Sequence, residues 1–212
     1  MKKVLFLLDR KNDWIKKFII NHNFIKKKKF IIKISYNMNL IKKYDIIFLI
    51  NYLKILSKNT VNKNFCLLVH GSNLPKDKGG APIQNQILRG KKRIHLSLIR
   101  VAEKLDSGDI YLKSSFKLDG SELNDEIRKI QAFKSLNLIK KFLNNYKIYK
   151  PKRQIGTSTY NKLRTAKDSL IDVKKSIKDQ FNLLRICDNE RYPAYFIFKK
   201  KKYILKIYKN NN

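Results

Sequence analysis

The chain has 212 residues, and its 49 Lys and Arg against 16 Asp and Glu give a formal net charge of +33 with the three histidines neutral. Hydrophobic residues make up 43% and aromatic residues 11% of the chain, which is enough to build a core and excludes wholesale disorder. Cys66 and Cys187 lie too far apart for a CxxC zinc module or a disulfide framework, so we expect two buried thiols. The length accommodates one domain with a smaller unit beside it.

The positive charge is spread along the whole chain. The excess is mostly Lys beside heavy use of Asn and Ile, which is typical of a coding sequence rich in A and T. The densest lysine runs, residues 26–29 and 199–202, stand between apolar stretches and favour solvated turns over a nucleic-acid or membrane patch. No uncharged apolar stretch approaches the roughly 20 residues of a membrane helix. We therefore expect a cytoplasmic protein without membrane insertion and without a nucleic-acid partner.

Four short apolar runs in the first third of the chain predict the strands of a mostly parallel sheet. They span residues 4–8, 30–34, 45–50 and 65–70, and they are near-continuous, as in strands that are covered on both faces. Between the first two runs, residues 13–20 carry apolar side chains at spacings of three and four, which predicts a crossover helix. This order predicts an α/β, Rossmann-like fold.

The middle of the chain predicts two helices and two further strands. Pro82 begins a helical stretch that Gly90 ends, and residues 94–101 and 110–118 predict strands. A long amphipathic helix follows Ser121, which is a candidate N-cap. The apolar face of that helix comprises Ile127, Ile130, Phe133, Leu136, Ile139 and Leu143.

The last third of the chain predicts a linker and a small accessory unit. Residues 151–165 are irregular and predict a linker that wraps back over the first domain. Residues 176–184 have helical spacing, and residues 195–198 and 203–208 flank a lysine turn as a β-hairpin. Because a lone hairpin is marginally stable, it must pack on a neighbour. We expect a main domain over 1–150 and an accessory unit over 151–212.

A histidine and an aspartate stand in loops beside predicted strand ends. His70 ends the run 65–70, and ligands of open α/β sheets bind at such ends. Asp106 stands in a second loop, and a carboxylate beside a histidine tunes it as a general base or hydrogen-bond catalyst. Taken alone, one His and one Asp in loops are more often structural than catalytic.

The segments 70–84 and 105–110 together resemble the signature of the folate-dependent formyltransferases, the superfamily of methionyl-tRNA formyltransferase and the sugar N-formyltransferases. That family has a His at a strand end, a Ser-Leu-Leu-Pro-type loop and a Leu-Asp-x-Gly-Asp loop. This chain reads His-Gly-Ser-Asn-Leu-Pro and Leu-Asp-Ser-Gly-Asp. Its tail resembles the compact sugar N-formyltransferases of surface-polysaccharide biosynthesis. The resemblance implies that residues 1–150 form a formyltransferase catalytic domain.

The same resemblance implies that His70 and Asp106 are the catalytic residues. The family carries an Asn two residues before the His, and Leu68 stands at that position here. The donor that stabilises the oxyanion is therefore unassigned. Asn73 is the tentative substitute, and Asn51 or a backbone N–H are the alternatives.

The resemblance also implies two ligands. The formyl donor is 10-formyltetrahydrofolate, and the acceptor is the amino group of a nucleotide-linked amino-deoxysugar. The implied folate-binding residues are Asn51, Tyr52, Leu53, Ile55, Leu105 and Asp109. The implied acceptor-binding residues are Ser72, Lys76, Lys78, Gly79 and Arg164. The alternative for residues 53–56 is plain packing in the core, and the alternative for Lys76 and Lys78 is solvation. The three histidines show no spacing typical of metal ligands.

Two other functions stay open. Formylation of Met-tRNA is favoured by the charge and disfavoured by a tail, from Gln154 on, that is short for the family's tRNA-binding barrel. A catalytically silent folate- or nucleotide-binding protein is favoured by the departure at Leu68. A homodimer is compatible with the sequence, and neither the sugar nor its base can be read from it.

Overall fold

The computed structural model describes residues 1–22 and 29–210, and within these it contains a six-stranded sheet in the order β2-β1-β3-β4-β6-β7. The strands are β1 (Lys2–Leu8), β2 (Phe30–Ser35), β3 (Ile46–Ile50), β4 (Cys66–His70), β6 (Arg93–Arg100) and β7 (Ile110–Lys117). The pairs from β2 to β4 are parallel, and β6 and β7 join antiparallel. The predicted α/β fold with a mostly parallel sheet is confirmed.

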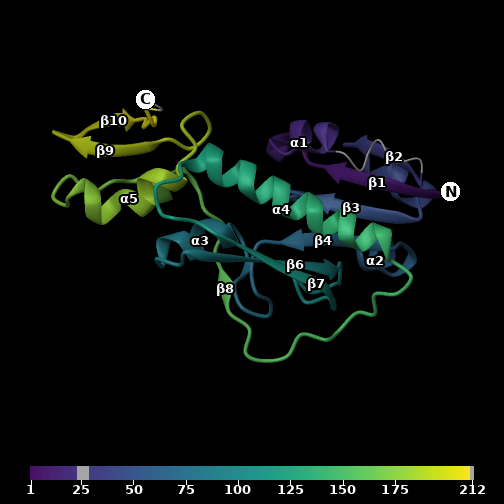
Figure 1. Cartoon of the computed structure of the whole chain (residues 1–212). Helices are drawn as coiled ribbons and strands as arrows, with labels where there is room; N and C mark the ends of the chain where they lie inside the picture. The colour runs from purple at the N-terminus through teal and green to yellow at the C-terminus, as the bar shows by residue number, and fades with distance from the viewer. Residues whose placement is uncertain (23–28, 211–212) are drawn as a thin grey trace.

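Both faces of the sheet are covered, which explains why β1 is continuously apolar. Val4, Phe6 and Leu8 pack on one face against α1 (Lys16–Asn21), α3 (Pro82–Leu88) and α4 (Asn124–Asn144). Leu5 and Leu7 pack on the other face with α2 (Lys58–Lys63) and the 3-10 helix η2 (Met38–Lys43). Figure 1 shows α4 lying across the first face. A second 3-10 helix, η1 (Arg10–Asn12), follows β1.

The long helix α4 begins differently from the prediction. Its N-cap is Leu123, whose backbone N–H donates to the Glu126 carboxylate at 2.9 Å. Ser121 is therefore not the cap, and its N–H donates instead to Asp119 Oδ1 at 2.7 Å. The assignment of Phe133 to the apolar face was also wrong, because its side chain is 57% exposed on the opposite side of the helix.

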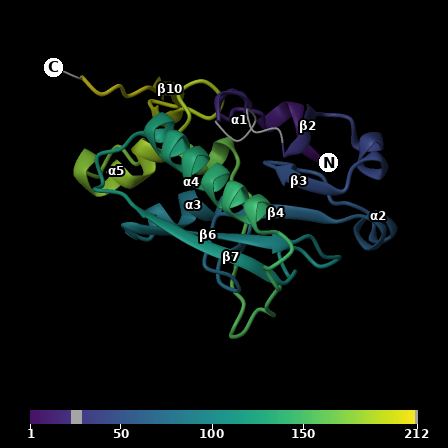
Figure 2. The same cartoon turned by 45° about the vertical axis from the view of Figure 1, so that its right-hand side comes forward.

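The C-terminal residues form a small unit beyond the N-terminal end of α4 (Figures 1 and 2). It comprises η3 (Ala166–Ser169), α5 (Ile177–Ile186), β9 (Ala194–Phe198) and β10 (Lys201–Leu205). The helix and the hairpin are confirmed, but the second strand begins at Lys201 and not at 203, because Lys201 and Lys202 pair with β9 and only residues 199 and 200 form the turn. A separate cluster of Ile171, Leu184, Cys187 and Ala194 forms the core of this unit. The other lysine run lies, apart from Lys29, outside the described residues.

The segment that joins α4 to α5 runs back along the first domain. Lys152 exchanges two backbone hydrogen bonds with Ile110, at 2.8 and 2.9 Å. Further on, β8 (Tyr160–Asn161) pairs parallel with β5 (Lys78–Gly79), which belongs to the loop after β4. The segment therefore contributes to the loop that follows His70. The division into 1–150 and 151–212 stays a prediction.

Candidate active site

His70 ends β4 and is held by oxygen atoms on both sides of its ring. It is 6% exposed. Its Nε2 lies 2.8 Å from the backbone oxygen of Asp77, and its Nδ1 lies 3.4 Å from Asp106 Oδ1. Because a carbonyl oxygen only accepts, the geometry assigns a proton to Nε2, which donates to Asp77. Nδ1 is then the ring nitrogen that faces Asp106.

Asp106 is fixed by contacts at its backbone and at its carboxylate. The residue lies in the β6–β7 loop with a positive φ of 49°. Its Oδ2 accepts the backbone N–H of Gly79 at 2.8 Å, which leaves Oδ1 to face His70. Its backbone oxygen accepts from Gln154 Nε2 at 2.7 Å, and the same amide donates to Gly108 at 2.8 Å. The predicted pair is thus brought together by a third segment.

The pair opens into a cavity of about 500 Å³. Residues after β1 and β3 line the cavity, as the carboxyl ends of parallel strands do in open α/β sheets. Residues from the start of α4 and from the C-terminal unit line it as well. A volume of this size accommodates a small-molecule ligand rather than a single water or ion.

Most of the predicted folate-binding residues line this cavity. They are Asn51, Tyr52, Leu53, Ile55 and Leu105. Asp109 does not, and its backbone oxygen accepts the N–H of Arg100 at 2.9 Å, closing the β6–β7 loop. Asn51 follows β3 with a positive φ of 49°, and its side-chain Nδ2 is buried without a hydrogen-bond partner. A buried, unpaired amide donor in a cavity wall is costly, which marks this atom for a ligand.

The predicted acceptor-binding residues are divided between the cavity and the loop around it. Gly79 and Arg164 line the cavity. Ser72 is fully buried and donates to the backbone oxygen of Lys76 at 2.6 Å, so its hydroxyl stabilises the loop. Neither Lys76, which is exposed, nor Lys78 lines the cavity. The Lys78 side chain is 5% exposed and its ammonium lies 5.8 Å from the centre of the Tyr160 ring.

Asn73 lies outside the cavity wall as well. Its Oδ1 accepts from Lys113 Nζ at 2.6 Å, and the same ammonium donates to the Leu74 backbone oxygen at 2.9 Å. This correction removes Asn73 as the substitute oxyanion donor, because its side chain is exposed and directed to β7. Leu68, at the position of the family's Asn, does line the cavity.

Sequence reasoning missed the residues that the C-terminal unit and α4 add to the wall. Arg128 of α4 lies over the Trp14 ring at 5.3 Å and pairs with Asp188 Oδ2 at 2.8 Å. Burial alone would raise the pKa of Asp188, but the Arg128 guanidinium and two backbone N–H donors outweigh it and lower that pKa. Arg191 and Tyr192 follow in the same wall. These residues are far apart in sequence, so no local pattern links them.

Both thiols are buried and unpaired, as predicted. Burial raises the pKa of Cys66 to about 11, so this thiol is neutral at physiological pH. Across the described ranges, no group of three or more His, Cys, Asp or Glu side chains is arranged to hold a metal ion. In the same ranges, no helix is long and apolar enough to cross a membrane.

Known proteins resemble this chain in sequence. Methionyl-tRNA formyltransferase of Thermotoga neapolitana is 28% identical over 155 residues, which cover 71% of this chain and 50% of that protein. The bifunctional polymyxin resistance protein ArnA of Wigglesworthia glossinidia brevipalpis is 30% identical over 156 residues, covering 71% of this chain and 24% of that protein. The chain therefore spans about half the length, or less, of these relatives.

Solved structures share the fold over nearly the whole chain. Methionyl-tRNA formyltransferase from Clostridium thermocellum has a TM-score of 0.83 at 22% identity, covering 100% of this chain and 96% of that one. A 4-N formyltransferase from Francisella tularensis has a TM-score of 0.76 at 20% identity and 97% coverage of both chains. HypX from Aquifex aeolicus in complex with tetrahydrofolic acid has a TM-score of 0.79 at 15% identity, covering 97% of this chain and 37% of that one.

The Formyl transferase family matches residues 9–141, a span that contains β3, β4, His70 and Asp106. This span is more than half of the chain. It therefore covers the strand-end histidine and the carboxylate beside it. The chain belongs to the formyl transferase family.

Proposed function

We propose that this protein transfers a formyl group from 10-formyltetrahydrofolate to the primary amine of a nucleotide-linked amino-deoxysugar. One observation carries the proposal: the His70–Asp106 pair opens into a cavity of about 500 Å³ whose wall contains both exposed apolar side chains and arginines. A donor and an acceptor bound together in this cavity would place the formyl carbon and the amine beside the pair.

The apolar residues of the cavity wall suit a folate. Leu53 and Leu105 are more than half exposed and Ile55 is 81% exposed, yet all three line the cavity, so a flat heterocycle would cover apolar surface that water now meets. The neighbouring fold that carries tetrahydrofolic acid, HypX, supports this assignment. When bound, 10-formyltetrahydrofolate supplies an acyl carbon at the oxidation level of formate.

The proton chemistry belongs to Asp106 and His70. Because Nε2 donates to Asp77, we assign the proton of the acceptor amine to the pair that His70 Nδ1 forms with Asp106 Oδ1. The same pair returns a proton to the departing folate nitrogen. Asp106 keeps its orientation throughout because Gly79 donates to its other oxygen.

We propose Asn51 as the donor to the oxyanion in place of the missing family Asn. Its Nδ2 is an unpaired, buried N–H donor in the same cavity wall, which is what a developing negative charge on the formyl oxygen requires. Its left-handed backbone conformation is one that Asn adopts more readily than most residues. The departure at Leu68 is then a relocation of the amide rather than its loss.

The arginines of the cavity wall suit an anionic acceptor. Arg164 and Arg191 line the cavity together with Tyr192, and each guanidinium also donates to a backbone oxygen of the chain, of Asp168 and Lys11 respectively. Guanidinium groups bind phosphates through paired N–H donors, and an aromatic ring stacks on a base or a sugar. We therefore place the nucleotide pyrophosphate near these arginines instead of near Lys76 and Lys78.

Met-tRNA is the second candidate acceptor. The net charge of +33 favours a polyanion, and the Thermotoga neapolitana relative is a methionyl-tRNA formyltransferase. The short tail does not count against tRNA, because the solved Clostridium thermocellum chain of that name is matched over 96% of its length. The nucleotide sugar is favoured because the catalytic pair opens into a cavity of about 500 Å³, which suits a small molecule.

The test is formyl transfer by the purified chain from 10-formyltetrahydrofolate to a panel of nucleotide-linked amino sugars and to Met-tRNA. We expect a formylated sugar amine, detected by mass spectrometry, and slow or no formylation of Met-tRNA. Efficient Met-tRNA formylation with no sugar product would replace this proposal by its rival. Folate binding without transfer to any amine would identify a silent homologue.

A further inference from the structure

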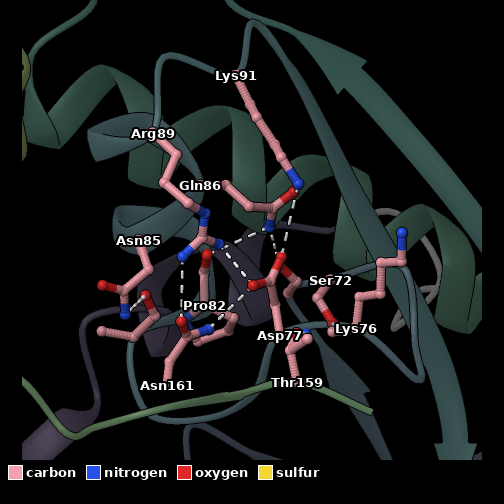
Figure 3. A network of polar contacts seen from close by, with 12 residues as sticks. Ser72, Lys76, Asp77, Pro82, Asn85, Gln86, Arg89, Lys91, Thr159 and Asn161 are labelled. Atoms are coloured by element: carbon pink, nitrogen blue, oxygen red, sulfur yellow. Dashed lines mark hydrogen bonds and ion pairs between the residues drawn. The ribbon is translucent and has the colours of Figure 1, made fainter. Parts of the chain in front are cut away.

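Asp77 stands at the centre of a polar network (Figure 3), and its backbone oxygen accepts from His70. It is buried, and its φ is +61°. Its carboxylate Oδ1 accepts from Arg89 Nη2 at 2.5 Å, and Oδ2 lies 3.8 Å from Lys91 Nζ. Asn161 donates to the same Oδ1 at 3.4 Å. The motif that relates the chain to its family does not account for this network.

The three residues 77–79 hold both members of the catalytic pair. The backbone oxygen of Asp77 accepts from His70, and the backbone N–H of Gly79 donates to Asp106. A displacement of this short stretch would therefore move the imidazole and the carboxylate together. It would also break the hydrogen bond that keeps the proton on Nε2.

The stretch is itself fixed from two other elements. Thr159 Oγ1 accepts the Asp77 N–H at 2.8 Å, and the Thr159 backbone oxygen accepts the Lys78 N–H at 2.8 Å. On the other side Arg89, at the end of α3, binds Asp77 and also donates to Asn161 Oδ1 at 3.2 Å. Arg89 thus ties α3, the catalytic loop and β8 to one carboxylate.

We propose that Asp77 is a positioning residue for formyl transfer, and that its ion pair with Arg89 sets the orientation of the His70 ring. The effect on kcat rests on the proposed function, whereas the effect on the His70 ring does not. The carboxylate side chain holds the loop in its left-handed conformation, the loop carbonyl takes the Nε2 proton, and Nδ1 is left to work with Asp106. Asp77 does not line the cavity, so it acts through His70.

The kinetic arm compares Asp77→Asn, Arg89→Ala and Arg89→Lys with the control Arg93→Ala, which removes an exposed arginine that donates to Ser115 on β7. Asn keeps the shape and the left-handed backbone of Asp77 but loses its charge. We expect kcat to fall by roughly 10- to 100-fold in Asp77→Asn and Arg89→Ala with KM for the folate nearly unchanged, because misplacing a catalytic group costs on this order. Arg89→Lys should recover most of the loss.

The second arm needs no activity. The chain has three histidines, so ¹⁵N-histidine NMR spectra are simple, and His70→Asn identifies the His70 signals. In Asp77→Asn and Arg89→Ala the His70 ring nitrogens should lose the pattern of a proton fixed on Nε2, whereas in Arg93→Ala they should keep it. Unchanged His70 signals in a folded Arg89→Ala variant would overturn the proposal. A fall in kcat that only matches the fraction of unfolded protein would also overturn it.

If no amine is formylated at all, the proposed function fails. The NMR spectra still decide whether Asp77 and Arg89 position His70.

Discussion

His70 is the residue on which the proposed chemistry depends most directly. His70→Asn removes the imidazole that pairs with Asp106, so we expect kcat to fall by roughly 10²-fold or more. His95→Asn is the matched control, because His95 lies on β6 outside the cavity wall. Single-turnover assays and thermal melts of both variants check the prediction. A His70→Asn enzyme with full kcat would contradict it.

Asp106 should separate catalysis from binding. Asp106→Asn preserves the side-chain shape and tolerates the positive φ, but it cannot take the proton from the amine. We expect turnover to fall and the pH profile to change while the folate still binds. Fluorescence titration with tetrahydrofolate measures the binding. Normal specific activity in a less stable protein would show that Asp106 is only structural.

Asn51 tests the relocated oxyanion donor. Asn51→Gly keeps the left-handed backbone and removes the amide, and we expect it to lower kcat by about 10²- to 10³-fold, as the loss of an oxyanion donor does. Adding Leu68→Asn restores an amide to the position where the family carries it and should recover part of this loss. Full activity in Asn51→Gly alone would assign the donor elsewhere.

At the scale of elements, the Arg128–Asp188 ion pair joins α4 to the loop after α5. Its removal in Asp188→Asn should cost about 1–3 kcal/mol of unfolding free energy at neutral pH, because a largely buried guanidinium loses its partner. Glu190→Gln, which removes only an exposed pair with Lys206, should cost about 0.5 kcal/mol or less. Urea unfolding measures both.

The pH dependence of that ion pair has a definite sign. Because the pKa of Asp188 is lower in the folded protein than in the unfolded chain, its contribution is complete above the unfolded pKa of about 3.9. It is lost as the pH falls through the folded value. The stability difference between the wild type and Asp188→Asn should therefore be constant near neutrality and shrink below about pH 4. A difference that grows on acidification would mean that another group is responsible.

The elements that the sequence predicted well are those whose signals are local. The apolar runs predict the strands because both faces of the sheet are covered, and Pro82 and Gly90 bracket α3. The motif brought His70 and Asp106 together correctly. Asn73 was misplaced because its side chain accepts from Lys113, a residue 40 positions away. Phe133 was misplaced because, among the described residues, no neighbouring element covers its side of α4.

The network around Asp77 could not be predicted in the same way. Its partners Thr159 and Asn161 stand 82 and 84 residues further along the chain. Nothing in the composition of residues 151–165 shows that two of them bond to the loop after β4. Arg164 was predicted for this cavity, but the place of Arg191 in its wall is hidden for the same reason, since the C-terminal unit must first pack beside α4.

For the whole molecule, salt should distinguish the two acceptors. A protein that makes 6–10 phosphate contacts loses about 10³- to 10⁵-fold in affinity between 50 and 200 mM salt, whereas a single pyrophosphate should lose far less. We expect the modest response in kcat/KM, and we expect Arg164→Ala and Arg191→Ala to raise KM for the nucleotide sugar more than they lower kcat. Lys76→Ala, outside the cavity, is the control. A steep salt dependence would favour tRNA.

The short pairing of β8 with β5 also orders events during synthesis. Because chains fold from the N-terminus as they are made, the sheet from β1 to β7 can form on the ribosome first. Arg89 of α3 can then already bind the Asp77 carboxylate, but the stretch 77–79 lacks its backbone partners until residues 159–161 have emerged. The loop that contacts both His70 and Asp106 is therefore completed only late in synthesis.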